Sequence, residues 1–512
     1  MELELKKTSL DVYETGGELN LTQEAAAETI VPDYCPDIAR IIKTEGKVFL
    51  HSRELRSGKA EVSGTVRVCV LYTPEGEGGI KALEFAVPFS AESDHRGFQN
   101  CRYLAVEADI ETLETRMLNP RKVSTRCTLR MNLTGYRRIT RQLCGDTVET
   151  DGIRVEKKKE TQRAILLTDV SEKDFTFTDK VMLSPGGEGM AELLSSRVRP
   201  AVTETRVLGR KLIFKGNFSV SLLYRDRQGI CRTAGAELPF SQIMEIETED
   251  ESAAADLRLQ LTGMDLQTDG ADPEGREIDL TLYFHASALL RREQETELLT
   301  DLYSTAFEVT YDAAPVEFTA VRETLNRRQT VRELLEIGTA AESVLSASAE
   351  CGSVTVSRDG SLATLRTSVR VAVLYLDEGG VPLLTQRRLD TSCQLELPEG
   401  CRVSGWADCT EEIQTSPSDR GIEVRFPVDF RIEAVGKVQK ACIMAAKLNT
   451  EAPKNTAGTP SLVLRCLGRQ ESPWELAKAC NTTVADILAA NQLEREEDIP
   501  ANRLLLIPRK RA

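Results

Sequence analysis

Apolar and polar residues alternate along the stretch EVSGTVRVCVLY, residues 61–72. Every even position is apolar or small, and the first four odd positions are polar. Successive side chains of a β-strand point to opposite faces, so this alternation predicts a half-buried strand. A glycine-rich turn, TPEGEGG, follows directly and predicts the end of that strand.

The same strand pattern occurs twice more, in KLIFKGNFSVSLLY and LRTSVRVAVLY. Each copy ends in a Leu-Tyr pair, and Tyr72, Tyr224 and Tyr375 are 152 and 151 residues apart. Farther along, each copy has a proline turn and a second alternating strand, with apolar positions in residues 123–131, 278–284 and 422–430. Repetition of the same order at a fixed period predicts three homologous β-rich units.

A short apolar segment precedes each of these strands with the spacing i, i+3 and i+4. That spacing places three side chains on one face of a helix, so we expect a short helix in each unit. In the third unit this segment lies 40 residues before the tyrosine instead of 30, which predicts an insertion of about ten residues, a size that loops tolerate. The residues concerned are Ile38, Ile41 and Ile42; Met190, Leu193 and Leu194; and Val331, Leu334 and Leu335.

The predicted fold is therefore mainly β. It consists of three tandem antiparallel sandwich-like or barrel-like repeats, each with a short helix, because strands with one polar face do not fit a parallel sheet. A smaller C-terminal unit has the order strand, helix, helix, strand. The expected boundaries are residues 1–155, 156–310 and 311–448 for the repeats, 449–461 for a linker rich in Pro, Thr and Ala, and 462–509 for the last unit.

The first repeat resembles the SPOCS domain of spore-forming Firmicutes. The segments VPDYCPDIARIIKTEGKV, residues 31–48, and NPRKVSTRC, residues 119–127, carry the resemblance together with the Leu-Tyr strand. The second and third repeats resemble that domain through pattern and spacing. The resemblance implies a role in sporulation.

The C-terminal stretch WELAKACNTTVADILAANQL, with its closing Ile-Pro, resembles a LysM domain. LysM domains bind N-acetylglucosamine glycans in a shallow groove between two loops. Here the usual Gly-Asp-Thr-Leu of the first loop is replaced by residues 470–473, QESP, which lack the glycine that lets a backbone approach a sugar. This change favours a protein contact over a glycan. The groove residues that the resemblance implies, for glycan or protein contact, are Glu471, Ser472, Trp474, Asn491, Leu493 and Ile499.

Two of these residues also have a purely structural interpretation. Trp474 can pack at the start of its helix, and Asn491 can cap the end of the next helix through side-chain bonds to the backbone. We favour the structural interpretation for both.

Composition narrows the function classes. The net charge of −15 argues against nucleic acid as the partner, since phosphate contacts need clustered Lys and Arg. The three histidines, His51, His95 and His285, lie far apart in the sequence, and no catalytic motif occurs, so we expect no enzyme, no metal and no cofactor.

Thirteen cysteines without a CxxC pair indicate small buried side chains. No signal peptide and no membrane-spanning run is recognisable, which predicts a protein of the cytoplasm.

The combination of SPOCS repeats with one terminal LysM domain resembles clostridial spore-coat morphogenetic proteins. It implies a structural adaptor on the mother-cell side of the forespore surface, with coat morphogenetic proteins, above all the coat's basement-layer ATPase, as partners. A peptidoglycan or cortex glycan binder is the alternative, and a wall-active enzyme targeted by LysM is a third possibility without visible catalytic residues.

Overall fold

The computed structural model describes residues 1–76, 78–149, 153–183, 189–268, 275–338, 340–418, 420–454, 460–466, 472–496, 499 and 504–509. As the alternating pattern predicts, the described chain is mainly β, and its named strand pairs are antiparallel. None of the helices in the described ranges is long and apolar enough to cross a membrane.

The first unit consists of six strands in two facing sheets. One sheet has the order β2-β3-β4. The other has the order β1-β6-β5 and is half of a six-stranded sheet that continues into the next unit. The strand bounds are β1 (Leu5–Ile30), β2 (Ile38–Arg56), β3 (Lys59–Pro74), β4 (Lys81–Asp94), β5 (Tyr103–Asn119) and β6 (Lys122–Thr147).

The second and third units follow the same plan. In the third unit two of the six strands are interrupted. The shorter strands β14 and β15 both pair with β16 and together replace the counterpart of β2. The shorter strands β18 and β19 both pair with β20 and together replace the counterpart of β5. Unit two comprises β7 (Val155–Met182), β8 (Met190–Leu208), β9 (Lys211–Asp226), β10 (Cys231–Glu245), β11 (Ala254–Thr268) and β12 (Glu277–Ser304). Unit three comprises β13 (Phe307–Glu336), β14 (Ala341–Cys351), β15 (Thr355–Asp359), β16 (Leu362–Asp377), β17 (Pro382–Glu396), β18 (Arg402–Asp408), β19 (Gln414–Ser418) and β20 (Gly421–Pro453).

The alternating faces point into the sandwiches, as the sequence predicts. Val66, Val68 and Val70 of β3 are fully buried, and they pack against Leu129 and Met131 of β6 in one apolar cluster. Corresponding clusters fill the other two units. Burial of one face of each sheet therefore supplies the driving force for each sandwich.

The segments predicted to be short helices are strands, so that prediction is wrong. In β2 the register shifts between Ile38 and Arg40 and again between Ile41 and Lys43, and β8 has two shifts at the matching places. A β-bulge inserts one extra residue, so apolar residues three apart return to the same face of the strand. Two successive bulges thus imitate the spacing of a helix.

The insertion predicted for unit three is also wrong. Residues 331–335 lie in β13, where they pair with β20. The true counterpart of the bulged segment is the start of β14, which shifts register between Ala341 and Ser343 and between Val344 and Ser346. Leu345 therefore precedes Tyr375 by the same 30 residues that separate Leu194 from Tyr224.

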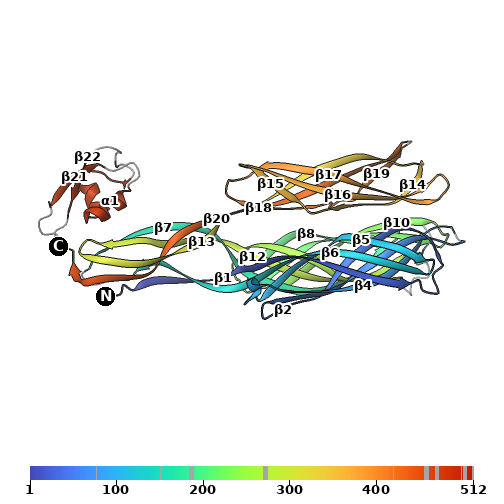
Figure 1. The fold of residues 1–512 in the computed structure, drawn as a ribbon, viewed down its shortest axis with the longest axis horizontal. Helices are drawn as coiled ribbons and strands as arrows, with labels where there is room; N and C mark the ends of the chain where they lie inside the picture. The colour runs from blue at the N-terminus through green and yellow to red at the C-terminus, as the bar shows by residue number, and fades with distance from the viewer. Residues whose placement is uncertain are drawn as a thin grey trace.

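The bulges also join the units. Leu194 and Leu345 are buried and share one cluster with the half-buried Ile42, their counterpart in unit one. The leucines that precede the three tyrosines, Leu71, Leu223 and Leu374, complete that cluster. The three sandwiches consequently lie beside one another at one end of the molecule, with their strands running along its long axis (Figure 1).

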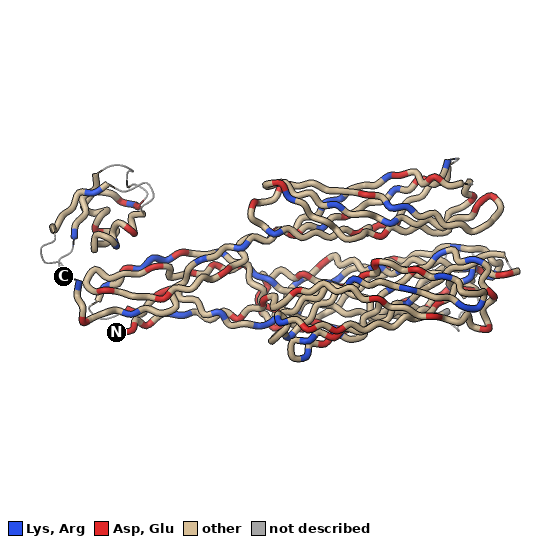
Figure 2. Tube along the Cα trace, viewed as in Figure 1, with Lys and Arg blue, Asp and Glu red and all other residues tan. Residues whose placement is uncertain are grey.

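The first and last strands of each unit extend beyond the sandwiches and form a stalk, made of the β1–β6, β7–β12 and β13–β20 pairs (Figure 1). Its apolar core takes residues from all three units, including Leu10, Ala164, Leu298 and Phe318. Lys and Arg are interspersed with Asp and Glu along the stalk and the sandwiches (Figure 2), so the net charge is spread over the molecule.

The C-terminal module lies beside the end of the stalk, near the N-terminus (Figure 1). It consists of β21 (Leu462–Cys466), α1 (Pro473–Cys480), α2 (Val484–Ala490) and β22 (Leu504–Pro508), and β21 pairs with β22. The segment predicted as a linker is partly strand, because β20 continues to Pro453. Residues 455–459 lie outside the described part of the chain.

Candidate functional site

Both helices of the module begin at side-chain caps that the sequence provides. Ser472 accepts a hydrogen bond from the backbone N–H of Glu475, and the Glu475 carboxylate accepts one from the Ser472 N–H, which makes a capping box. Thr483 caps α2 by accepting a hydrogen bond from the backbone N–H of Asp486 at 3.0 Å. Ser472, a predicted groove residue, therefore has a structural role.

Trp474 joins the module to the stalk. Its indole Nε1 donates to Asp301 Oδ2 at 2.7 Å, and its ring meets the ring of Tyr303 edge-on, with centroids 4.9 Å apart. Both partners lie on β12. Trp474 therefore packs at the start of its helix, but these two partners lie in unit two and not within the small domain, where the sequence interpretation placed its packing.

The side-chain amide of Asn491 forms its hydrogen bonds inside the module. Its side-chain amide donates to the carbonyls of Ile487 and Leu506, both at 2.7 Å, and its Oδ1 accepts from the Leu506 N–H at 2.8 Å. The residue thus caps α2 and ties it to β22, as its structural interpretation predicts. Leu493 and Ile499 are half-buried. Glu471 lies outside the described residues.

Asp301 is the centre of the contact between module and stalk. Besides Trp474 it accepts hydrogen bonds from Lys478 Nζ at 2.6 Å and from Tyr311 Oη at 2.8 Å. Burial by itself raises the pKa of Asp301, but these three donors outweigh it and hold the pKa below its usual value. Tyr303 Oη also donates to the carbonyl of Thr482 at 2.8 Å. These residues belong to no motif, so the sequence by itself does not single them out.

The face of the module's sheet that points away from its helices is apolar and exposed. Leu462, Leu464 and Leu504 are 52, 61 and 61% exposed. The register pairs Leu464 with Leu506 and Cys466 with Leu504, so these residues share one side, which we call the outer face of the module. On the other side Leu505 and Ile507 are buried. Contiguous exposed apolar side chains of this kind mark interaction sites.

Four apolar side chains are exposed at the far end of unit one, where β1 and β5 end; the register places Ile30 and Met117 on opposite faces of the sheet. Ile30 is 71% exposed, Tyr34 88%, Met117 42% and Leu118 53%. We call these four residues the distal surface. Ile30 and Asn119, the neighbour of Leu118, both pair with Lys122 of β6, which places the ends of β1 and β5 on either side of that strand.

Arg121 fixes the loop that presents Tyr34. Its guanidinium donates to the carbonyls of Val31 and Cys35, both at 2.8 Å, and to the carboxylates of Asp33 and Asp37 at 3.1 and 3.0 Å. A loop held by these bonds loses little conformational entropy on binding, and its exposed tyrosine suits a contact with another protein. The segments VPDYCPD and NPRK that carry the SPOCS resemblance thus meet in one bonded cluster.

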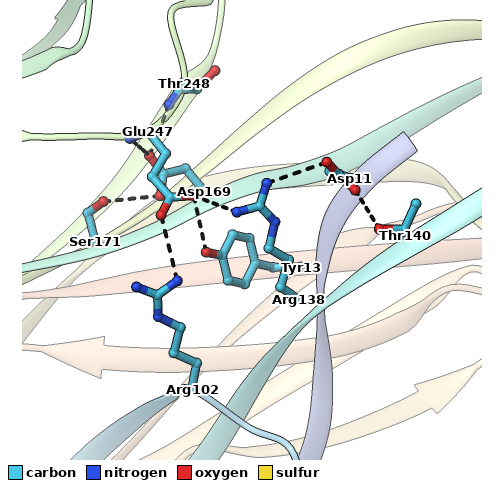
Figure 3. Close-up of polar contacts among 9 residues, drawn as sticks. All are labelled: Asp11, Tyr13, Arg102, Arg138, Thr140, Asp169, Ser171, Glu247 and Thr248. Carbon is cyan, nitrogen blue, oxygen red and sulfur yellow. Dashed lines mark hydrogen bonds and ion pairs between the residues drawn. The ribbon is translucent and has the colours of Figure 1, made fainter. Parts of the chain in front are cut away.

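A polar cluster links units one and two where the stalk begins (Figure 3). Asp169 is fully buried and accepts hydrogen bonds from Ser171 Oγ and from the backbone N–H groups of Glu247 and Thr248. The Glu247 carboxylate also contacts Tyr13 Oη and, in unit one, Arg102 and Arg138. Burial and the nearby Glu247 charge raise the pKa of Tyr13 to about 12, so the phenol is neutral near pH 7. Every group is bonded within the cluster, which indicates a structural role.

Further charged contacts brace the units. Glu45 of unit one lies 2.5 Å from Lys43 and accepts from Ser195 Oγ of unit two at 2.6 Å, with Arg197 at 3.7 Å. Burial alone raises the pKa of Glu45, but the ion pairs and the hydrogen bonds lower it to about 2.

The junction of all three units contains another such group. Arg258 of unit two pairs with Glu107 of unit one, and its guanidinium lies 5.8 Å from the ring centroid of Trp406 of unit three. Asp256 of unit two pairs with Arg322 of unit three. Among the described residues no group of three or more His, Cys, Asp or Glu is arranged to hold a metal ion.

Comparison with family models identifies the repeated unit. Residues 37–118 and 190–268 match the model described as SipL, SPOCS domain. The two SPOCS matches span β2–β5 of unit one and β8–β11 of unit two, the same part of each sandwich. They support SPOCS domains in units one and two and suggest a sporulation-related protein. Searches of the curated proteins and of the solved structures gave no match.

Proposed function

We propose that this SPOCS protein is a non-enzymatic structural adaptor in spore-coat assembly. It tethers coat morphogenetic proteins, with the coat's basement-layer ATPase as the main partner, at the forespore surface on the mother-cell side. The observation that carries the proposal is two sets of exposed apolar residues, the four named the distal surface and those of the outer face of the module. They lie at opposite ends of a braced body, which is the arrangement an adaptor needs to hold two partners apart.

Three further features support this proposal. The two SPOCS matches connect the chain to sporulation. The module's sequence resembles LysM, yet its Trp474 and Asn491 are used in docking and capping, which leaves two of the implied groove residues without free polar groups for a sugar. The polar groups described at the unit junctions are hydrogen-bonded or ion-paired to one another, which fits a structural role.

The test uses the full chain and the double variant Leu462→Glu, Leu464→Glu. Two exposed apolar residues of unit two serve as the matched control, in the variant Leu208→Glu, Ile243→Glu. We expect saturable binding of the wild type and the control to the purified basement-layer ATPase in a surface-binding assay, and at least tenfold weaker binding of the module variant.

The same proteins are sedimented with purified peptidoglycan. Saturable co-sedimentation of the wild type without any binding to the ATPase would overturn the adaptor proposal and establish the glycan-binding alternative.

A further inference from the structure

Two thiols of unit three face each other. All thirteen cysteines are free, and Cys351 and Cys409 bring their Sγ atoms to 3.4 Å, although 58 residues separate them in the chain. Cys351 is half-buried at the end of β14, and Cys409 is fully buried just after β18. A disulfide bond has an S–S length of about 2.05 Å, so the two sulfur atoms need to approach by only about 1.4 Å to form one.

The pair lies where the two interrupted strands of unit three meet. Residues 352–354 separate β14 from β15, and residues 409–413 separate β18 from β19. In units one and two the corresponding strands are continuous. A segment outside a regular strand can shift by about an ångström without breaking the sheet's hydrogen bonds, so this site tolerates the approach that bond formation requires.

Packing alone does not require cysteines at this place. Val369 of unit three and Val66 of unit one are equivalent, because each lies six residues before the tyrosine of its Leu-Tyr pair. Cys351 pairs with Val369 and Val48 pairs with Val66, so Cys351 is the counterpart of Val48. By the same correspondence, Asp408 matches Asp109, so Cys409 matches Ile110. Val48 and Ile110 are half-buried apolar residues that pack on the core of unit one. Two apolar residues of unit one are therefore replaced by two facing thiols in unit three.

The segment after Cys409 also holds unit three against unit two. The carbonyl of Glu411 accepts a hydrogen bond from Arg199 at 3.3 Å, and the Glu412 carboxylate accepts one from Ser221 Oγ at 2.9 Å. Arg199 and Ser221 lie on β8 and β9 of unit two. A covalent bond from Cys409 to β14 would fix this contact segment to the body of its own unit.

We propose that Cys351 and Cys409 are an oxidisable dithiol whose disulfide locks residues 409–413 onto β14. With a low-molecular-weight disulfide as oxidant, the Cys351 sulfur attacks one sulfur of that disulfide and releases the first thiol. The Cys409 sulfur then attacks the Cys351 sulfur of the mixed disulfide and releases the second thiol. The two protein thiols lose their protons to the departing thiolates, so the dithiol is oxidised and the added disulfide is reduced.

The order of attack follows from exposure, since only Cys351 reaches the surface. The hydrogen bond with Cys409, followed by burial, raises the pKa of the Cys351 thiol above its usual value. Because the thiolate is the nucleophile, the reaction is slow near neutral pH and accelerates as the pH rises.

The test treats the full-length reduced chain with oxidised glutathione and maps disulfides by mass spectrometry after blocking the remaining thiols. We expect a loss of two hydrogens and a cross-linked peptide that joins Cys351 to Cys409. We also expect faster formation at pH 9 than at pH 7, and a higher unfolding temperature that a reductant reverses.

Cys351→Val, which restores the residue of unit one, should abolish the cross-link and its thermal effect and should leave the reduced protein folded. Cys231→Ser changes a half-buried cysteine of unit two and should leave both unchanged. A stable glutathione adduct on Cys351 that Cys409 never displaces would overturn the proposal, as would a disulfide map without the 351–409 bond.

Discussion

Trp474 of the C-terminal module donates its indole N–H to the carboxylate of Asp301 in unit two, at 2.7 Å. The two residues are 173 positions apart in the chain. With Lys478 and Tyr311 bonded to the same carboxylate, the contact holds the module against the stalk instead of leaving it on a free tether. Any partner of the module therefore meets it in a fixed orientation.

Asp301→Ala should release the module. Hydrogen bonds to a charged group contribute about 1.5–3 kcal/mol, so the undocked population should rise roughly 10- to 100-fold. Hydrogen exchange of the α1 amides measures this change. Asp312→Ala, at an exposed aspartate of β13, is the control and should leave the exchange unchanged. Equal exchange in both variants would show that Asp301 does not hold the module.

Gly216→Ala should destabilise unit two by about 1–3 kcal/mol, because a Cβ at this place would lie 2.0 Å from the carbonyl oxygen of Ala201. Gly235→Ala is the matched control, since its Cβ would meet nothing nearer than the Val220 carbonyl oxygen at 3.6 Å. The free energy of unfolding of unit two in the two variants is compared by chemical denaturation, with limited proteolysis of unit two as the readout. Equal unfolding of the two variants would show that β8 and β9 do not approach closely at Gly216.

Acid should weaken the contact between units one and two through Glu45. The pKa of Glu45 is about 2 in the folded protein and near its usual value of 4.5 when unfolded. The stabilisation is therefore complete above about pH 5 and is lost as the pH falls toward 2, up to about 3 kcal/mol.

Glu45→Gln provides the comparison for that effect. This variant should be less stable than the wild type at pH 7, and the difference should shrink as the pH falls from 5 to 3. Calorimetric unfolding at each pH measures it. A difference that stays constant with pH would contradict the assignment to the Glu45 carboxylate.

Arg121→Met should free the loop that carries Tyr34. The substitution removes four hydrogen bonds, so amide exchange in residues 31–37 should increase at least tenfold while the cores of units two and three stay protected. Arg116→Met, at an arginine that is 80% exposed, is the control and should change little. Unchanged exchange in the loop would show that the main-chain bonds alone fix it.

The strand faces were predictable because burial has a local signature. Val66, Val68 and Val70 alternate with polar residues, and one face of a sheet must leave water wherever the sheet packs. The apparent helices were mispredicted for an equally local reason, since two bulges give apolar residues a spacing of three. Leu345 was missed as the counterpart of Leu194 because residues 331–335 imitate that spacing ten residues earlier.

The candidate sites were less predictable. The interpretations of Asn491 as a cap and of Trp474 as a packing residue rested on local rules and hold in the structure. The partners of Trp474, the four acceptors of Arg121 and the thiol facing Cys351 come from distant parts of the chain, and no spacing rule connects them.

The sequence by itself determined the alternation of strand faces, the repetition of the Leu-Tyr strand and the strand–helix–helix–strand order of the C-terminal module, because neighbouring residues specify local conformation and burial. The tertiary structure decided how the three units pack around the Leu194 cluster, where the module docks and which thiols meet. These relationships depend on side chains that only the packing of sheets brings within a few ångströms.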